Sequence, residues 1–247
     1  MFVGSIEDKK KSIKKRIQVS IIVITAALLS YQIVSYFSQE GTIQFFKGIW
    51  RNPTYVGAIA PCSQAVAEET VRYLKASNQD FVNVLEVGGG TGQFTKTIEK
   101  TLQNLLLEGK IKNYKVDVIE IDSEYCTELT RMFSHNKNIT IHCKDASVGF
   151  NAKYDFIISS LPFTNLPVDL VQKILTNYQQ SIVSGGIVSY IEHKYLPVIL
   201  SKFLFGKKFE EFCSRKKIIN DFRESGACVR NTVWKNIIPM FVYHIKF

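Results

Sequence analysis

The chain of 247 residues is 46% hydrophobic and 21% charged, which excludes a disordered protein and fits one α/β domain with an extra segment. Its net charge of +9 indicates an anionic partner, either a nucleic acid or an anionic membrane surface. The cysteines are scattered without a CxxC pair, and the histidines show no metal-ligand spacing. We therefore expect a reducing compartment with free thiols, no disulfide framework and no metal site.

The first forty residues combine a basic block with a long uncharged stretch. Six cations lie between Lys9 and Arg16, and residues 17–39 carry no charge. As a helix this stretch would cover about 35 Å, enough to cross a bilayer. Polar residues recur every seventh position from Gln18 to Gln32, which also suits a helix lying in the interface with its cations on anionic headgroups. We expect residues 1–40 to form a peripheral, membrane-associating helix, with a true span as the alternative.

Residues 41–80 are typical of a stiff aromatic loop that leads into a helix. Pro53 and Pro61 restrict the loop, and Cys62 or Ser63 is placed to cap the helix. We expect this segment to cover the site of a domain formed by residues 81–247.

From residue 81 onward, strand patterns alternate with helical patterns. Strands are expected in FVNVLEV, YKVDVIEID, ITIHCKDAS, YDFIISSLP and GGIVSYIEH. Helices are expected in GQFTKTIEKTLQNLLLEGK, SEYCTELTRMFSHN and VDLVQKILTNYQQSIV. This alternation predicts an α/β fold with a doubly wound, mostly parallel sheet. The last segment, CVRNTVWKNIIPMFVYHIKF, predicts an antiparallel hairpin at the sheet edge.

A glycine-rich loop, LEVGGGTGQFT, joins the first strand to the first helix. Lys96 lies four residues after the last glycine, which excludes a phosphate loop of the type GxxxxGK[ST]. Gln93 stands where a dinucleotide fingerprint counted from Gly88 needs glycine. The pattern present is E-x-G-x-G-x-G, formed by Glu86, Gly88, Gly90 and Gly92.

This loop and its context resemble motif I of the class I S-adenosylmethionine-dependent methyltransferases, whose glycines let the backbone approach a sulfonium cofactor closely. The resemblance implies that Glu86 carries a negative charge near the cofactor's cationic groups. It also implies that Glu120, or alternatively Asp122, accepts hydrogen bonds from the ribose hydroxyls, and that Asp145 meets the adenine amino group. The residues expected to bind S-adenosylmethionine are Glu86, Gly88, Gly90, Gly92, Glu120, Ile121, Asp145, Ala146 and Ser159.

The segment SSLPFTNLP is similar to the N-L-P-[FY] and N-P-P-[FY] loops of amino-group methyltransferases. In those loops a polar residue and a backbone carbonyl orient the target nitrogen, and an aromatic ring packs on it. Ser160 stands in the place of the usual asparagine or aspartate. Leu161 and Pro162 would supply carbonyls, and Phe163 a ring that suits the positive charge growing on the nitrogen.

Two families share this series of motifs: the rRNA adenine N6-dimethyltransferases and the bacterial phospholipid N-methyltransferases, which convert phosphatidylethanolamine towards phosphatidylcholine. NPTYVGAIAPCSQAVA and VWKNIIPMFVY resemble two segments of the lipid enzymes, with Cys62 in place of a serine and Ile238 in place of a proline. The 80 residues after Pro167 leave little room for an appended helical RNA-binding domain. We expect an aminophospholipid substrate and no nucleic-acid partner; an rRNA adenine or another aminolipid is the alternative.

The acceptor chemistry requires a neutral amine, because an ammonium with a pKa of about 10 has no lone pair for attack. Desolvation or a base must remove its proton. Tyr190, Glu192 and His193 end the fifth strand near the expected methyl group, and Tyr55 could close over it. Since the cofactor is cytosolic, we expect a membrane-associated protein on the cytoplasmic face; spanning with the basic end inside would place the domain outside.

Overall fold

The computed structural model describes residues 62–194, 205–236 and 238–247. The expected membrane-associating helix over residues 1–40, the loop that precedes the capped helix, and Tyr55 lie outside these ranges. Within the described ranges, no helix has the length and apolar character needed to cross a membrane.

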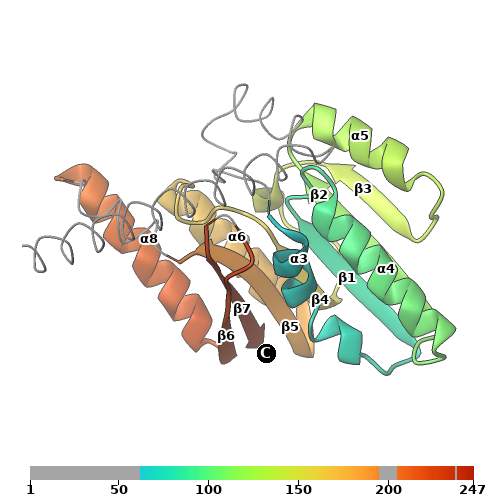
Figure 1. Ribbon diagram of the computed structural model, residues 1–247. Helices are drawn as coiled ribbons and strands as arrows, with labels where there is room; N and C mark the ends of the chain where they lie inside the picture. The colour runs from blue at the N-terminus through green and yellow to red at the C-terminus, as the bar shows by residue number, and fades with distance from the viewer. Residues whose placement is uncertain (1–61, 195–204, 237) are drawn as a thin grey trace, which may run out of the picture. The chain divides into compact units, whose positions relative to one another are not determined.

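A seven-stranded sheet forms the centre of the domain, in the order β3-β2-β1-β4-β5-β7-β6 (Figure 1). The first five strands pair in parallel, and β7 runs antiparallel to both of its neighbours. The expected mostly parallel sheet with a closing hairpin is therefore confirmed. The strands are β1 (Phe81–Val87), β2 (Asn113–Glu120), β3 (Ile139–Cys143), β4 (Tyr154–Ser159), β5 (Ile182–His193), β6 (Ala227–Val233) and β7 (Met240–Lys246).

The hairpin folds back so that its second strand, β7, lies next to β5, and its first strand, β6, forms the edge. Burial explains this order. The first four residues of β6 are exposed, whereas five of the seven residues of β7 are buried. An apolar strand gains most from a central position, and a strand with an exposed start tolerates an edge.

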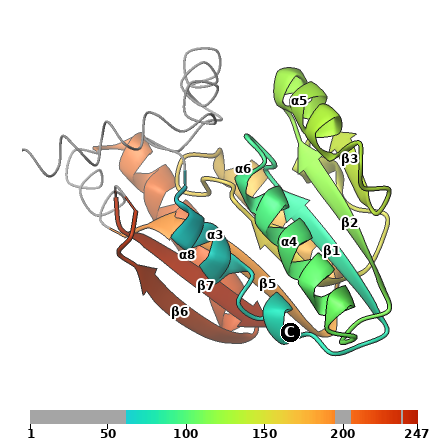
Figure 2. The same cartoon turned by 45° about the vertical axis from the view of Figure 1, so that its right-hand side comes forward.

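Helices cover both faces of the sheet (Figure 1, Figure 2). The alternation of β1 sets the two faces: Val82 and Val84 pack with α4 and α5, whereas Leu85 and Val87 pack with α6 and α8. The short helix α3 packs beside α4. The helices are α3 (Gln64–Thr70), α4 (Gln93–Leu107), α5 (Ser123–Phe133), α6 (Val168–Ser181) and α8 (Lys207–Glu224), with 3-10 turns η1 (Leu74–Ala76) and η2 (Ala146–Val148).

The cap of α3 is Ser63, not Cys62. The Ser63 hydroxyl accepts a hydrogen bond from the backbone N–H of Val66 at 3.4 Å. This bond satisfies one of the N–H groups that a helix start leaves without an intrahelical partner.

Candidate active site

A cavity of about 340 Å³ lies where the parallel strands end. Parallel strands point their carboxyl ends to one edge of a sheet, so motifs far apart in sequence meet there. The expected residues that line it are Gly88, Gly90, Glu120, Ile121, Asp145, Ala146, Ser160, Leu161, Pro162, Phe163, Tyr190, Glu192 and His193. Glu86, Gly92 and Ser159 do not line it.

Gly88 and Gly90 of the glycine-rich loop are each required for a different structural reason. Gly88 has a φ of +87°, and a Cβ there would lie 2.6 Å from the hydroxyl of Ser160. Gly90 has a φ of +49°, and a Cβ there would meet no atom within 4 Å. Both backbones are left-handed, which favours glycine. The loop therefore lets the segment after β4 approach at Gly88 and keeps open space at Gly90.

Glu120 is held at the cavity wall by the backbone. One carboxylate oxygen accepts from the N–H groups of Ile121 and Asp122 at 2.8 and 2.9 Å, and the other accepts from the N–H of Gly90 at 2.8 Å. Since a carboxylate offers about four acceptor positions, Glu120 is fixed and still has acceptor capacity. Asp122, the alternative, also borders the cavity, but its carboxylate caps α5 by accepting from two N–H groups.

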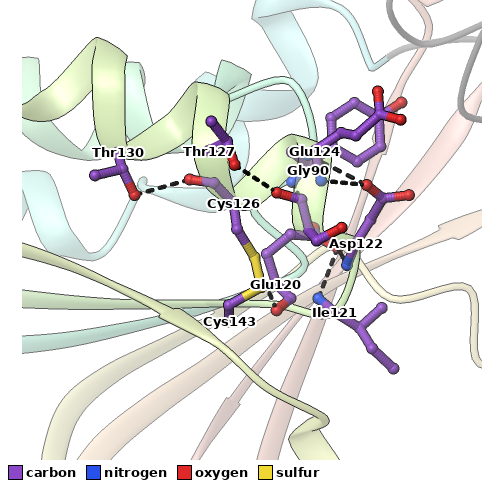
Figure 3. The surroundings of a disulfide bond; sticks show 11 residues. Gly90, Glu120, Ile121, Asp122, Glu124, Cys126, Thr127, Thr130 and Cys143 are labelled. Atoms are coloured by element: carbon purple, nitrogen blue, oxygen red, sulfur yellow. Dashed lines mark hydrogen bonds between the residues drawn. A yellow bond between two sulfur atoms is a disulfide. The ribbon is translucent and has the colours of Figure 1, made fainter.

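A disulfide between Cys126 and Cys143 lies directly beside Glu120 (Figure 3). Cys143 pairs with Glu120 across β2 and β3, and the Cys126 sulfur lies 3.5 Å from the Glu120 carbonyl oxygen. The expectation of free thiols is therefore wrong for these two cysteines. The reason is tertiary: α5 packs against β3 and brings the two Cα atoms to 5.7 Å, within the usual disulfide range.

Glu86 lies outside the cavity and is fully buried. Neither of its carboxyl oxygens has a hydrogen bond of ordinary geometry among the described residues, although Thr95 lies close enough to lower the pKa of the carboxyl through its hydroxyl and backbone N–H. Burial raises the pKa of Glu86 to about 8, and the charge of Glu120 adds to the rise. The carboxyl is therefore mostly protonated at neutral pH, which corrects the expected negative charge.

Asp145 and Ala146 follow β3 and lie on the cavity wall beside Lys144. The Asp145 carboxylate accepts from the N–H of Ser147 at 2.7 Å and so caps the turn η2. One oxygen thereby fixes the side chain.

The acceptor loop after β4 (residues 160–167) is tied to the glycine loop. The Ser160 hydroxyl donates to the carbonyl oxygen of Gly88 at 2.6 Å, and the Ser160 N–H donates to the carbonyl of Val87 at 3.0 Å. Because the hydroxyl proton is committed to Gly88, the lone pairs of the Ser160 oxygen are left to accept an N–H.

The rest of the acceptor loop is a tight turn. The carbonyl of Leu161 accepts from the N–H of Phe163, and that of Pro162 accepts from Asn165. Each carbonyl retains one further lone pair. The Phe163 ring is 3% exposed and meets the ring of Tyr190 edge to face at 5.6 Å between centroids. The ring borders the cavity as part of a packed aromatic cluster.

The three candidate bases at the end of β5 differ in their hydrogen-bond partners and in their pKa. Tyr190 accepts from the guanidinium of Arg223, and burial raises the pKa of its phenol. Glu192 forms an ion pair with the same Arg223. Burial lowers the pKa of His193, and its Nδ1 is buried without a hydrogen-bond partner in the described part of the chain. Of the three, His193 has the neutral, uncommitted nitrogen that a base requires.

The N-terminal end of helix α3 and the loop between β6 and β7 meet next to the cavity. The N–H of Ser63 donates to the side-chain oxygen of Asn236 at 2.8 Å, and its hydroxyl donates to the carbonyl of Lys235 at 2.6 Å. These contacts join two segments that lie more than 170 residues apart in the sequence. Cys62 and Met240 line the cavity next to this junction.

Several lining residues were not expected from the sequence. They include Lys144, Leu166, Leu170, Ile174 and Ile219. The apolar ones follow ordinary helix or loop patterns, so the sequence carries no signal that separates cavity lining from core. No group of metal-ligating side chains with a suitable arrangement occurs among the described residues.

Comparison with known proteins shows the fold. No family model matches the chain, and no curated protein matches its sequence. The N-methyltransferase NodS from Bradyrhizobium japonicum WM9 aligns with a TM-score of 0.54 at 13% identity, over 73% of this chain and 93% of NodS. NodS in complex with S-adenosyl-L-homocysteine aligns with a TM-score of 0.51 at 13% identity, over 72% and 85%. An S-adenosylmethionine-dependent methyltransferase from Clostridium acetobutylicum ATCC 824 gives 0.52 at 14%, over 75% and 92%.

The chain therefore has the fold of the class I S-adenosylmethionine-dependent methyltransferases. Its cavity lies at the strand ends, where open α/β sheets bind their ligands.

Proposed function

We propose that this protein is an S-adenosylmethionine-dependent N-methyltransferase that methylates the amine of phosphatidylethanolamine at an anionic membrane surface, on the cytoplasmic face. The observation that carries methyl transfer is the hydrogen bond from Ser160 to Gly88. It joins the loop suited to a sulfonium cofactor with the loop suited to an amine, within one cavity. The lipid substrate is supported by the two segments that meet at Ser63 and Asn236, and by the basic, apolar first forty residues.

The cavity residues fit S-adenosylmethionine. Glu120 has acceptor capacity for ribose hydroxyls, Asp145 and Ala146 border the place for adenine, and the open space at Gly90 admits a ligand close to the backbone. The cofactor, when bound, supplies an electrophilic methyl group on a positively charged sulfur.

The residues of this chain then prepare the amine. Desolvation in the cavity would lower the pKa of the ammonium, and His193, whose own lowered pKa keeps the imidazole neutral, would accept the proton. The Ser160 oxygen accepts one N–H and so directs the nitrogen lone pair, while the Phe163 ring favours the growing positive charge. Holding the amine in line accounts for much of the rate, because orientation replaces a bimolecular encounter.

The decisive test uses the purified full chain, tritium-labelled methyl donor, and vesicles of phosphatidylethanolamine with phosphatidylglycerol. We expect label in the lipid extract, and none in rRNA offered in a parallel reaction. Glu120→Gln should lower the transfer at limiting S-adenosylmethionine by at least about tenfold, and the exposed Glu108→Gln should preserve it. Label in rRNA with none in lipid contradicts the proposal; label in another aminolipid alone moves the substrate to that lipid.

A further inference from the structure

The cavity has an apolar wall that, apart from Phe163, the methyl-transfer chemistry leaves unused. We define this wall by Phe163, Leu166, Leu170, Ile174 and Ile219, which come from the acceptor loop, α6 and α8. All five pack in or against the hydrophobic cluster between the sheet and these two helices. In strand order, the wall lies on the side of β4 and β5, whereas the cofactor acids follow β2 and β3 on the other side of β1.

The wall continues directly from the place expected for the amine. Phe163 belongs to both, since it is part of the acceptor loop and of the wall. Leu170 and Ile174 lie one helical turn apart on α6 and so present one face. An acceptor whose nitrogen sits at Ser160 therefore shares one cavity with these apolar side chains, which its acyl chains would meet beyond the phosphate and glycerol.

We infer that the apolar wall holds hydrocarbon of the methyl acceptor, so that the enzyme selects amines attached to an acyl chain. This inference rests on the proposed function and names the part of the cavity that would recognise the lipid. Hydrocarbon gains free energy by leaving water for such a surface. A nucleobase would bring ring nitrogens that these five side chains cannot satisfy.

The charge beside the wall is compensated. The Glu192 carboxylate, which borders the cavity, pairs with Arg223 of α8. The Arg223 guanidinium also lies 3.8 Å over the ring of Tyr243. Because the carboxylate is neutralised in place, it does not oppose an uncharged chain.

The test compares glycerophosphoethanolamine with its dibutanoyl and dihexanoyl esters, all kept below the concentration at which they form aggregates. The wild-type kcat/KM should rise along this series by at least tenfold overall, since each buried methylene contributes up to about fourfold. Leu170→Trp fills the wall at a half-buried position and should remove that rise. The affinity of Leu170→Trp for S-adenosylhomocysteine should stay within about twofold, because the cofactor acids follow β2 and β3, on the other side of β1 from the wall.

Leu107→Trp is the matched control, because Leu107 on α4 is 87% exposed and lies outside the cavity. Binding of the fluorescent fatty acid cis-parinaric acid provides a readout without methylation. Wild type and Leu107→Trp should bind it, and Leu170→Trp should not.

The outcomes separate the two proposals. A flat kcat/KM across the series, with methylation intact, overturns the apolar wall and leaves the proposed function. Absent methylation of every ethanolamine, with parinarate binding lost only in Leu170→Trp, overturns the proposed function and leaves the wall. Parinarate binding that Leu170→Trp leaves unchanged counts against the wall in either case.

Discussion

The hydroxyl of Ser160 donates a hydrogen bond to the carbonyl oxygen of Gly88 at 2.6 Å, across 72 residues of sequence. The parallel pairing of β1 with β4 makes this contact possible, because it sets Val87 beside Ser159 and thus the two following loops side by side. The hydrogen bond links the glycine-rich loop, which is expected to bind the cofactor, with the acceptor loop. Because Gly88 has no side chain, the Ser160 hydroxyl has room to approach it.

Replacing Ser160 by alanine should lower kcat/KM for the amine by about two- to tenfold, the range expected for one hydrogen bond. Affinity for S-adenosylhomocysteine, measured by calorimetry, should change little because Gly88 keeps its backbone conformation. Ser134→Ala is the control, because the Ser134 hydroxyl also donates to a backbone carbonyl but is exposed and lies outside the cavity. Equal activity of Ser160→Ala and wild type would remove the role given to this hydroxyl.

Glu120→Gln should weaken S-adenosylhomocysteine binding by at least about tenfold, since an amide NH₂ would face backbone N–H donors and one acceptor would be lost. Asp122→Asn should change the affinity less, because asparagine also caps a helix. Calorimetric titration of both variants checks this ranking. Equal losses would mean that the two acids share the ribose site.

His193 should govern the acidic limb of the rate profile. Its pKa is lowered by burial, so the active neutral form is present already below its ordinary pKa of 6.5, and kcat/KM should fall only at lower pH. Replacing His193 by asparagine should reduce kcat by about a hundredfold or more. Initial rates of the wild type and the variant, measured as a function of pH, test this prediction. An unchanged acidic limb in the variant would assign the base elsewhere.

Glu86 should make the chain less stable as pH rises. Its pKa is about 8 when folded and 4.5 in the reference state, so the folded chain retains a proton that the unfolded chain releases. The free energy of unfolding should therefore fall between these values and level off above pH 8 or so. Glu86→Gln should flatten this slope in urea titrations, with a gain over wild type of at least about 1 kcal/mol near pH 8 relative to pH 6.

The control for that experiment is Glu108→Gln, whose carboxylate is half exposed. If the slope stays the same after Glu86→Gln, the buried carboxyl is not its source.

Reduction of the Cys126–Cys143 disulfide should destabilise the part of the cavity that is expected to bind S-adenosylmethionine. The bridge spans 17 residues and joins the segments that carry Glu120 and Asp145. A loop of this size contributes about 3 kcal/mol to the free energy of unfolding. Dithiothreitol, or Cys126→Ser with Cys143→Ser, should lower both the Tm and the affinity for S-adenosylhomocysteine. Cys213→Ser, an exposed free cysteine, should change neither. Identical melting curves with and without dithiothreitol would contradict this.

The sequence by itself determined the seven strands, the helices α3 to α6 and the edge of the sheet at which the cavity lies. Apolar periodicity is local, so β1 and α4 could be read directly from their residues. Parallel strands end at one edge, so the motifs after β1, β2, β3 and β4 had to meet there. The glycine spacing by itself excluded two kinds of phosphate-binding loop.

Only the tertiary structure determined the features that depend on contacts between segments far apart in the sequence. These are the insertion of β7 between β5 and β6, the Cys126–Cys143 bridge, the ion pair of Glu192 with Arg223, and the cavity-facing side of Leu170 and Ile174. The protonation of Glu86 belongs with them, because its pKa follows from burial. The conformational preferences of a few neighbouring residues determine helices and strands. Strand pairing, burial and the protonation of side chains depend instead on long-range contacts, which form only when the whole chain folds.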